Sequence, residues 1–201
     1  MAYAASLPDA VLDGVARQLG GMLETLDPAM VEVPVGLAET FPVWLLNRPN
    51  DGETLHELAT PTTQWHHQIR TAAGRPVAFA RSTHPAADGD DDAAPALVRS
   101  DIATRLDDAI AWIDQHVPEP AEVRLLVAPA YQLHAFWLVR DGDSRVVVSD
   151  FPEGSLELRP GQIYPEQAFL AALRTAEPIT GVRSAEEEAA WSERPAETPL
   201  K

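Results

Sequence analysis

Histidine is the side chain of this sequence best suited to acid–base or metal chemistry, because it titrates near neutral pH and binds metals through either ring nitrogen. The chain has six of them: His56, His66, His67, His84, His116 and His134. His66 and His67 are adjacent, and neighbouring side chains of a strand point to opposite faces, so these two cannot easily share one metal ion. A zinc site needs three or four converging ligands, and no two histidines have a spacing that would start one. The sequence therefore predicts no metal site.

A second candidate site pairs His134 with Asp150. Both lie in residues 133–150, LHAFWLVRDGDSRVVVSD, which the turn DGDS divides into two expected strands. This stretch resembles the second half of papain-like and bacteriocin-processing peptidases, in which a histidine is the general base and an acid orients it. The resemblance implies a hydrolase with His134 as the base and Asp150 as the orienting acid.

The sequence departs from that family in two ways. The peptidases need a cysteine nucleophile upstream, and this chain has no cysteine. We also expect Arg140 to pair with Arg145 across the turn. Asp150 then lies opposite Ala135, so it faces the other side of the sheet from His134 unless a bulge intervenes.

Other signatures of catalysis or cofactor binding are missing from the sequence. It has no G-x-S-x-G serine elbow and no glycine-rich phosphate loop. The lack of cysteine excludes disulfides and thiolate metal sites. The sequence predicts no cofactor, and His67 beside a carboxylate is the only other catalytic base that we consider.

Aromatic and basic side chains on the expected hairpin and central strand are the candidates for a binding surface. Tryptophan, tyrosine and arginine are favoured at binding hot spots, although in a domain of this size aromatic residues also fill the core. The residues we expect to bind are Trp65, His66, His67, Arg81, Tyr131, His134 and Trp137. We expect His67 to be half-buried and His66 to be exposed.

The elements that would position these residues follow from hydrophobic periodicity. Alternating apolar residues predict a hairpin over 64–82 and strands near 123–127, 131–140 and 145–150. Stripes at helical spacing predict helices over 6–26, 100–117 and 164–175. Shorter strands are expected over 43–46 and 156–158. Because most connections are hairpins, we expect an α+β fold in which a mostly antiparallel sheet packs against three helices.

Composition and charge suggest how the molecule is organised and what it meets. The 201 residues carry a net charge of −16, which disfavours nucleic acid and anionic membranes and favours a basic partner. We expect one domain over 1–176 with a flexible acidic loop at 84–96, followed by a flexible acidic tail over 177–201. The amino terminus does not resemble a signal peptide and no apolar run could span a membrane, so we expect a bacterial, cytoplasmic protein.

These observations favour a non-catalytic accessory protein that binds a peptide or protein, more readily a basic one. The first alternative is a small hydrolase that uses His134 or His67 with a nearby carboxylate. The second is a structural component of a larger bacterial assembly. The sequence does not indicate an oligomeric state.

Overall fold

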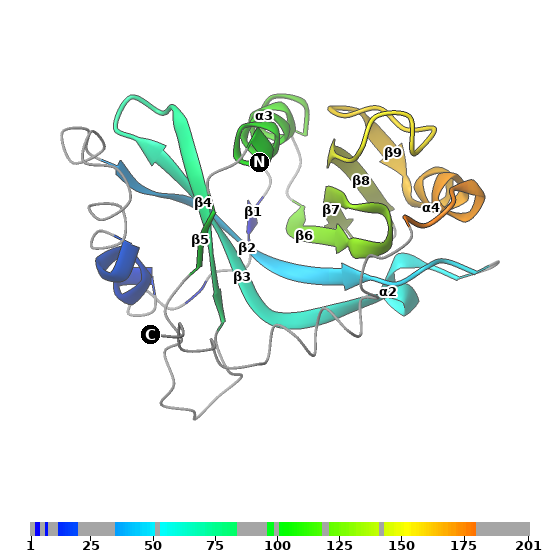
Figure 1. Ribbon diagram of the computed structural model, residues 1–201, viewed down its shortest axis with the longest axis horizontal. Coiled ribbons are helices and arrows are strands. Elements are labelled where there is room, and N and C mark those ends of the chain that lie inside the picture. Colours follow the sequence, from blue (N-terminus) through cyan, green and yellow to red (C-terminus); the bar gives the residue numbers. More distant parts are fainter. Residues whose placement is uncertain are drawn as a thin grey trace, which may run out of the picture.

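The computed structural model describes residues 3–4, 7, 12–19, 35–50, 53–83, 96–98, 101–117, 121–140 and 143–179. Within these ranges, nine strands form a single sheet in the order β5-β4-β3-β2-β6-β7-β8-β9, with β1 beside β6 (Figure 1). The strands are β1 (Tyr3–Ala4), β2 (Val35–Leu46), β3 (Ala59–Thr71), β4 (Pro76–Thr83), β5 (Ala96–Val98), β6 (Glu122–Ala128), β7 (Leu133–Arg140), β8 (Asp143–Asp150) and β9 (Ile163–Pro165). The pairs of β6 with β1 and with β2 are parallel, and the other pairs are antiparallel. The expected α+β fold with a mostly antiparallel sheet is confirmed.

Helices cover both faces of this sheet. They are a helix over 12–19, the short α2 (Leu55–Leu58), α3 (Asp101–His116) and α4 (Glu166–Thr175). The three helices expected from apolar stripes are present, although only 12–19 of the first lies within the described residues. No helix of the described part of the chain is long and apolar enough to cross a membrane.

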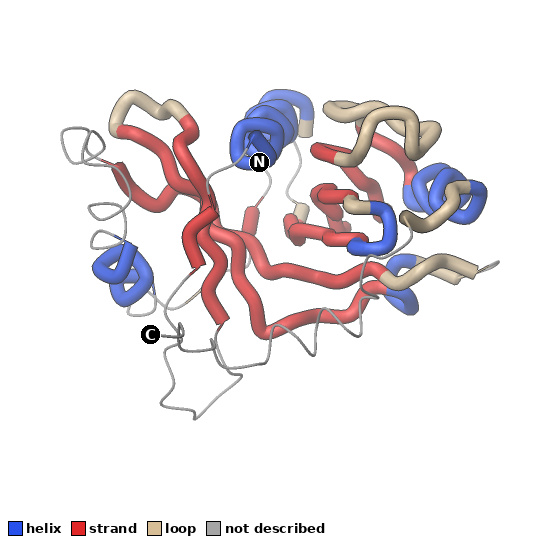
Figure 2. The backbone as a smooth tube through the Cα atoms, viewed as in Figure 1, coloured by secondary structure: helices blue, strands red, loops and turns tan. Residues whose placement is uncertain are grey.

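Two long strands join the two halves of the sheet. Figure 2 shows β2 and β3 running side by side across the molecule, with β4 and β5 at one end and β6 to β9 at the other. We expected only a short strand over 43–46, because Pro42 removes a backbone donor. Pro42 is tolerated because it lies beside a register shift with β3 and just before Val43, where the pairing with β6 begins.

The main core lies between α3 and one face of the sheet. The helix contributes its apolar stripe, including the fully buried Leu106 and the buried Ile110 and Ile113. The sheet contributes Phe41 and Phe136, whose rings meet edge to face with centroids 5.1 Å apart. This packing places α3 against β4 of one half of the sheet and against β7 and β8 of the other (Figure 1).

Two further cores lie on the opposite face. One joins α2 and α4 to β6, β7 and β8, and it contains Phe169, Leu170 and the completely buried Trp137. The other joins Val15 and Leu19 of the helix over 12–19 to β3 and β4. Together these layers bury the central strands on both faces, which explains their apolar sequences.

Several expected boundaries need correction. The strand expected over 131–140 begins at Leu133, because Pro129–Tyr131 form a 3-10 turn that ends in a left-handed Gln132 with φ of 48°. Residues 156–158 form no strand, since 156 and 157 belong to a bend, and Leu156 and Leu158 are buried in the core. Most of the expected acidic loop and of the tail, 84–95 and 180–201, lies outside the described residues.

Candidate functional site

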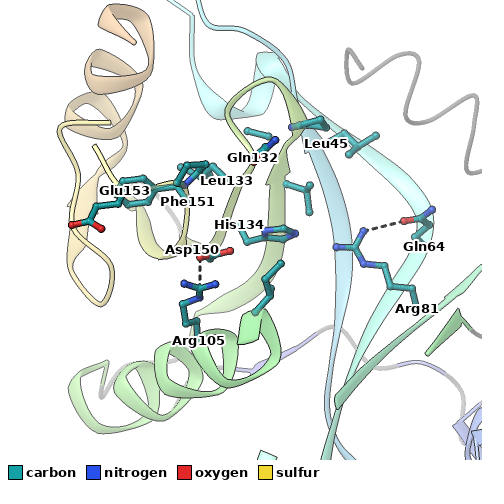
Figure 3. Close-up of a pocket in the computed structure, with 15 residues that line it drawn as sticks. Leu45, Gln64, Arg81, Arg105, Gln132, Leu133, His134, Asp150, Phe151 and Glu153 are labelled. Atoms are coloured by element: carbon teal, nitrogen blue, oxygen red, sulfur yellow. Dashed lines mark hydrogen bonds and ion pairs between the residues drawn. The ribbon is translucent and has the colours of Figure 1, made fainter. Parts of the chain in front are cut away.

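A pocket of about 590 Å³ lies at the strand ends of the sheet, where β6 and β8 end and β7 begins (Figure 3). Its apolar walls come from side chains of several elements and connections, among them Leu45, Ile102, Val127, Leu133 and Phe151. Its polar lining consists of Gln64, Arg81, Arg105, Gln132, His134, Asp150 and Glu153. A cavity in which apolar walls surround converging polar groups is a usual form of a ligand site.

A β-bulge in β8 brings Asp150 to the same side of the sheet as His134. Ala135 pairs with Val148, but His134 pairs with Asp150, so Ser149 is the extra residue. Without the bulge, Asp150 would share the face of Val148, which belongs to the opposite core. The Ser149 hydroxyl donates to the His134 carbonyl at 2.9 Å and thereby holds the bulge.

The register that we expected across this turn is therefore wrong. Arg140 pairs with Asp143 rather than with Arg145, because the turn is two residues tighter than expected. The bulge that the sequence left open is present, and it places Asp150 opposite His134.

Despite this register, His134 and Asp150 do not form a hydrogen-bonded pair. The Oδ1 atom of Asp150 instead lies 3.0 Å from Nε of Arg105, in the second turn of α3. The Asp150 side chain is 11% exposed and that of Arg105 is 50% exposed, so the ion pair is half open to solvent. The carboxylate thus positions Arg105 rather than orienting the imidazole.

His134 is held in its neutral form. Burial first, and then the positive charges of Arg81 and Arg105, lower the pKa of His134 from 6.5 to about 3. Its Nδ1 atom is buried and has no hydrogen-bond partner in the described structure, whereas the ring as a whole still lines the pocket. A buried N–H without an acceptor costs more than a buried lone pair, so we assign the proton to Nε2, the nitrogen that can reach the pocket.

Arg81 flanks the imidazole on the side opposite to the Asp150–Arg105 pair, as Figure 3 shows. One of its terminal nitrogens lies 3.4 Å from Oε1 of Gln64, on the neighbouring strand β3. Burial and the charge of Arg81 also lower the pKa of His66, which pairs with Arg81 across β3 and β4. Arg81 therefore acts electrostatically on both histidines.

His66 and His67 face opposite sides of β3, as the alternation of the strand predicts. His66 stacks near Phe79, and its Nε2 lies 3.2 Å from Oε1 of Gln68. The Nε2 atom of His67 is 2.7 Å from the Ser82 hydroxyl on the other face. Our expectation that His66 is exposed and His67 half-buried is wrong, because both are completely buried.

The expected aromatic binding residues do not gather at the pocket. Tyr131 and Trp137 belong to the core with α4, and Trp137 donates from Nε1 to the Ser144 hydroxyl at 2.6 Å. Trp65 is half-buried and shares the face of His67, away from the pocket. Of the binding residues that we expected, the pocket contains only Arg81 and His134.

Arg105, Gln64, Ile102 and Phe151 are pocket residues that the sequence did not reveal. A weak signal existed for Arg105, because it directly precedes Leu106 in the apolar stripe and so lies at the border of the buried face. The other three carry no motif. Gln64 lies on β3, Ile102 on α3 and Phe151 just after β8, and they meet through the strand order of the sheet and the packing of α3 on it.

The described residues contain no group of three or more histidine, aspartate or glutamate side chains that could hold a metal ion. Comparisons with protein-family models, with curated proteins and with solved structures found no match.

Proposed function

We propose that this protein is a non-catalytic binding protein that receives a segment of a peptide or protein in the pocket around His134. The observation that carries the proposal is the pocket itself. Its apolar walls surround a polar floor that consists of His134, Arg81 and the Arg105–Asp150 pair. Such a lining offers both burial of apolar surface and oriented hydrogen-bond donors, which are the two requirements of specific recognition.

The chemistry of the residues at the bottom of the pocket supports binding rather than catalysis. A general base works best when its pKa lies near the working pH, and the pKa of about 3 makes His134 a weak base at neutral pH. The described residues that line the pocket include no serine, threonine, tyrosine or cysteine that could serve as a nucleophile. The Asp150 carboxylate is engaged by Arg105.

A basic peptide remains the partner that the charge of the whole chain favours. The net charge of −16 attracts basic chains over a range of about one Debye length, roughly 10 Å at ordinary salt concentrations. A structural role in a larger assembly, a bacterial origin and a cytoplasmic location stay predictions.

One observation favours a second candidate function, a hydrolase. The bulge places His134 opposite Asp150, so a carboxylate released by Arg105 would lie on the same side of the sheet as the imidazole. Such a contact would raise the pKa of His134 and make it a better base. This candidate predicts turnover of a substrate that is lost in a His134→Gln variant.

Binding of fluorescein-labelled peptide pools tests the proposal. Hexapeptides with three lysines or arginines form the basic pool, and the matched pool carries glutamate in their place. We expect the basic pool to bind the wild-type chain, and Ile102→Trp to abolish binding because the indole fills the pocket from α3. Thr104→Trp is the matched control, because it introduces the same side chain at an exposed position of the same helix.

Circular dichroism and a thermal midpoint show whether both tryptophan variants fold. Equal binding by the wild-type chain and a folded Ile102→Trp variant would overturn the location of the site. Absence of binding by either pool, together with hydrolysis of ester or peptide substrates that depends on His134, would favour the hydrolase.

A further inference from the structure

We propose that the base of the pocket binds a carboxylate, and that its natural occupant is the free C-terminal carboxylate of a peptide whose last residue is apolar. This inference rests on the proposed function and specifies which part of the peptide enters the pocket. Capture of a terminal carboxylate by a cluster of donors is a recognised mode of peptide binding.

Hydrogen-bond donors from three side chains converge at the bottom of the pocket. Arg81 approaches His134 from one side and Arg105 approaches from the other (Figure 3). Both guanidinium charges are close enough to act on the imidazole. With the proton on Nε2, the ring adds a neutral N–H donor between two cations, and oxygen atoms of an anion can accept from all three.

The charge of these residues is a second feature. Asp150 compensates part of the charge of Arg105, and Figure 3 shows the carboxylate of Glu153 directed away from His134. The base is therefore suited to a group with a single negative charge rather than to a doubly charged phosphate. A cationic group would meet two arginines there and is disfavoured.

The walls are a third feature of the pocket. Leu45, Val127, Leu133 and Phe151 line the pocket together with His134, and Val127 pairs with His134 across β6 and β7. A carboxylate that enters must carry an apolar group beside it to fill this space. A C-terminal leucine, valine or phenylalanine has that combination, and so does a free fatty acid.

The test compares peptides that differ only at the terminal group. The probes are fluorescein-labelled basic hexapeptides that end in leucine, valine or phenylalanine, prepared either as free acids or as C-terminal amides. Because a charged hydrogen-bonding group is lost in the amide, we expect the free acids to bind at least about tenfold more tightly. In the Arg81→Met and His134→Phe variants, the ratio of free-acid affinity to amide affinity should fall to about one.

Circular dichroism and a thermal midpoint must show that both variants fold, because an unfolded chain with a net charge of −16 would bind the basic acid and amide probes alike. Arg159→Met is the matched control, because Arg159 is exposed in a loop outside the pocket. It should keep the wild-type ratio. Equal binding of acid and amide by the wild-type chain would overturn the carboxylate site while leaving peptide binding intact.

Octanoate separates the two possible sources of the carboxylate. Competition by octanoate against the free-acid peptides supports one shared carboxylate site. Octanoate binding that is lost in Arg81→Met, with no peptide bound at all, would keep the carboxylate site and overturn the proposed peptide occupant. Failure of both octanoate and the peptides to bind would overturn the site.

Discussion

A single histidine determines the chemistry of this pocket. His134 lies at the start of β7, where two arginines and burial hold it neutral with a pKa of about 3. A neutral imidazole that stays neutral over the physiological range is a hydrogen-bond donor of fixed geometry rather than a proton carrier. This difference is the reason for proposing a binding site in place of the acid–base pair that the same residue types suggest in the sequence.

The lowered pKa of His134 predicts how stability depends on pH. In the unfolded chain the ring returns to its ordinary pKa of about 6.5, so between pH 3 and 6.5 the unfolded chain binds more protons than the folded one. The free energy of unfolding should therefore fall as the pH falls through this window. Of the fall between pH 7 and 5, about 1 to 2 kcal/mol should come from His134.

Urea unfolding at pH 7 and at pH 5 measures this contribution. His134→Gln should show a smaller difference between the two values than the wild-type chain does, whatever its absolute stability. Arg159→Met should keep the full difference, because it removes no group that titrates in this range. An unchanged difference in His134→Gln would show that the histidine is not held neutral by the fold.

The sequence predicts the face of a strand on which a side chain lies better than it predicts whether that side chain is buried. Alternation along 64–70 separates His66 from His67 correctly, because the direction of a strand side chain is a local property. Whether each face is covered depends on helices far away in the chain, which the strand does not encode. Gln68, for example, donates to the Ala103 carbonyl of α3 at 2.9 Å.

At the scale of elements, the position of α3 decides whether the pocket exists. The helix is tied to β3 by Asp107, whose Oδ1 accepts from Arg70 Nε at 2.6 Å and from Gln68 Nε2 at 3.2 Å. Nearer the start of the same helix, Ile102 and Arg105 form one wall of the pocket. The polar tie and the apolar stripe therefore jointly fix this wall.

Replacing Asp107 by asparagine tests the contribution of its hydrogen bonds with Arg70 and Gln68. The variant weakens a buried hydrogen bond from Gln68 and a partly buried one from Arg70, and leaves the Arg70 charge with Glu39 as its ion-pair partner. We therefore expect it to lose about 1 to 3 kcal/mol of unfolding free energy. Asp108→Asn is the matched control at the next, exposed position, and it should change stability by less than about 0.5 kcal/mol. Chemical denaturation at pH 7 compares them, and equal losses would contradict the role of Asp107.

Register is the element-scale feature that the sequence could not supply. The hairpin from β7 to β8 was predicted, but its turn is tighter than expected and its bulge at Ser149 has no sequence motif. A shift of one residue exchanges the two faces of a strand, so a small error in register reverses the conclusion about Asp150. The hydrogen bond from the Ser149 hydroxyl to the His134 carbonyl stabilises the observed register, and this contact is visible only in the folded structure.

At the scale of the whole molecule, the α+β class was predictable and the site was not. Periodicity and hairpin turns define the class because both are local patterns. The pocket instead gathers Leu45, Arg81, Arg105 and His134 from strands and a helix that are far apart along the chain. The long β2 and β3 strands make that meeting possible, and their joint path across the sheet depends on pairing partners rather than on composition.

The net charge of −16 predicts a salt dependence that belongs to the whole surface. Binding of the basic free-acid peptides should weaken about tenfold between 50 and 500 mM sodium chloride, because salt screens exposed charges. Peptides with glutamine in place of lysine and arginine should bind more weakly at low salt, and their affinity should fall much less as the salt concentration rises. Fluorescence anisotropy at several salt concentrations measures both series, and identical slopes would show that the surface charge does not select the partner.

The most direct test of the account is the protonation state of His134 in the folded, ligand-free chain. A long-range ¹H–¹⁵N correlation spectrum at pH 7 distinguishes the two neutral tautomers from the charged ring, and the signals missing in His134→Gln identify the residue. We predict a neutral ring with its proton on Nε2, and a shift of that N–H signal when a free-acid peptide or octanoate is added. A charged ring, or a proton on Nδ1, would contradict the donor that the proposed binding site requires.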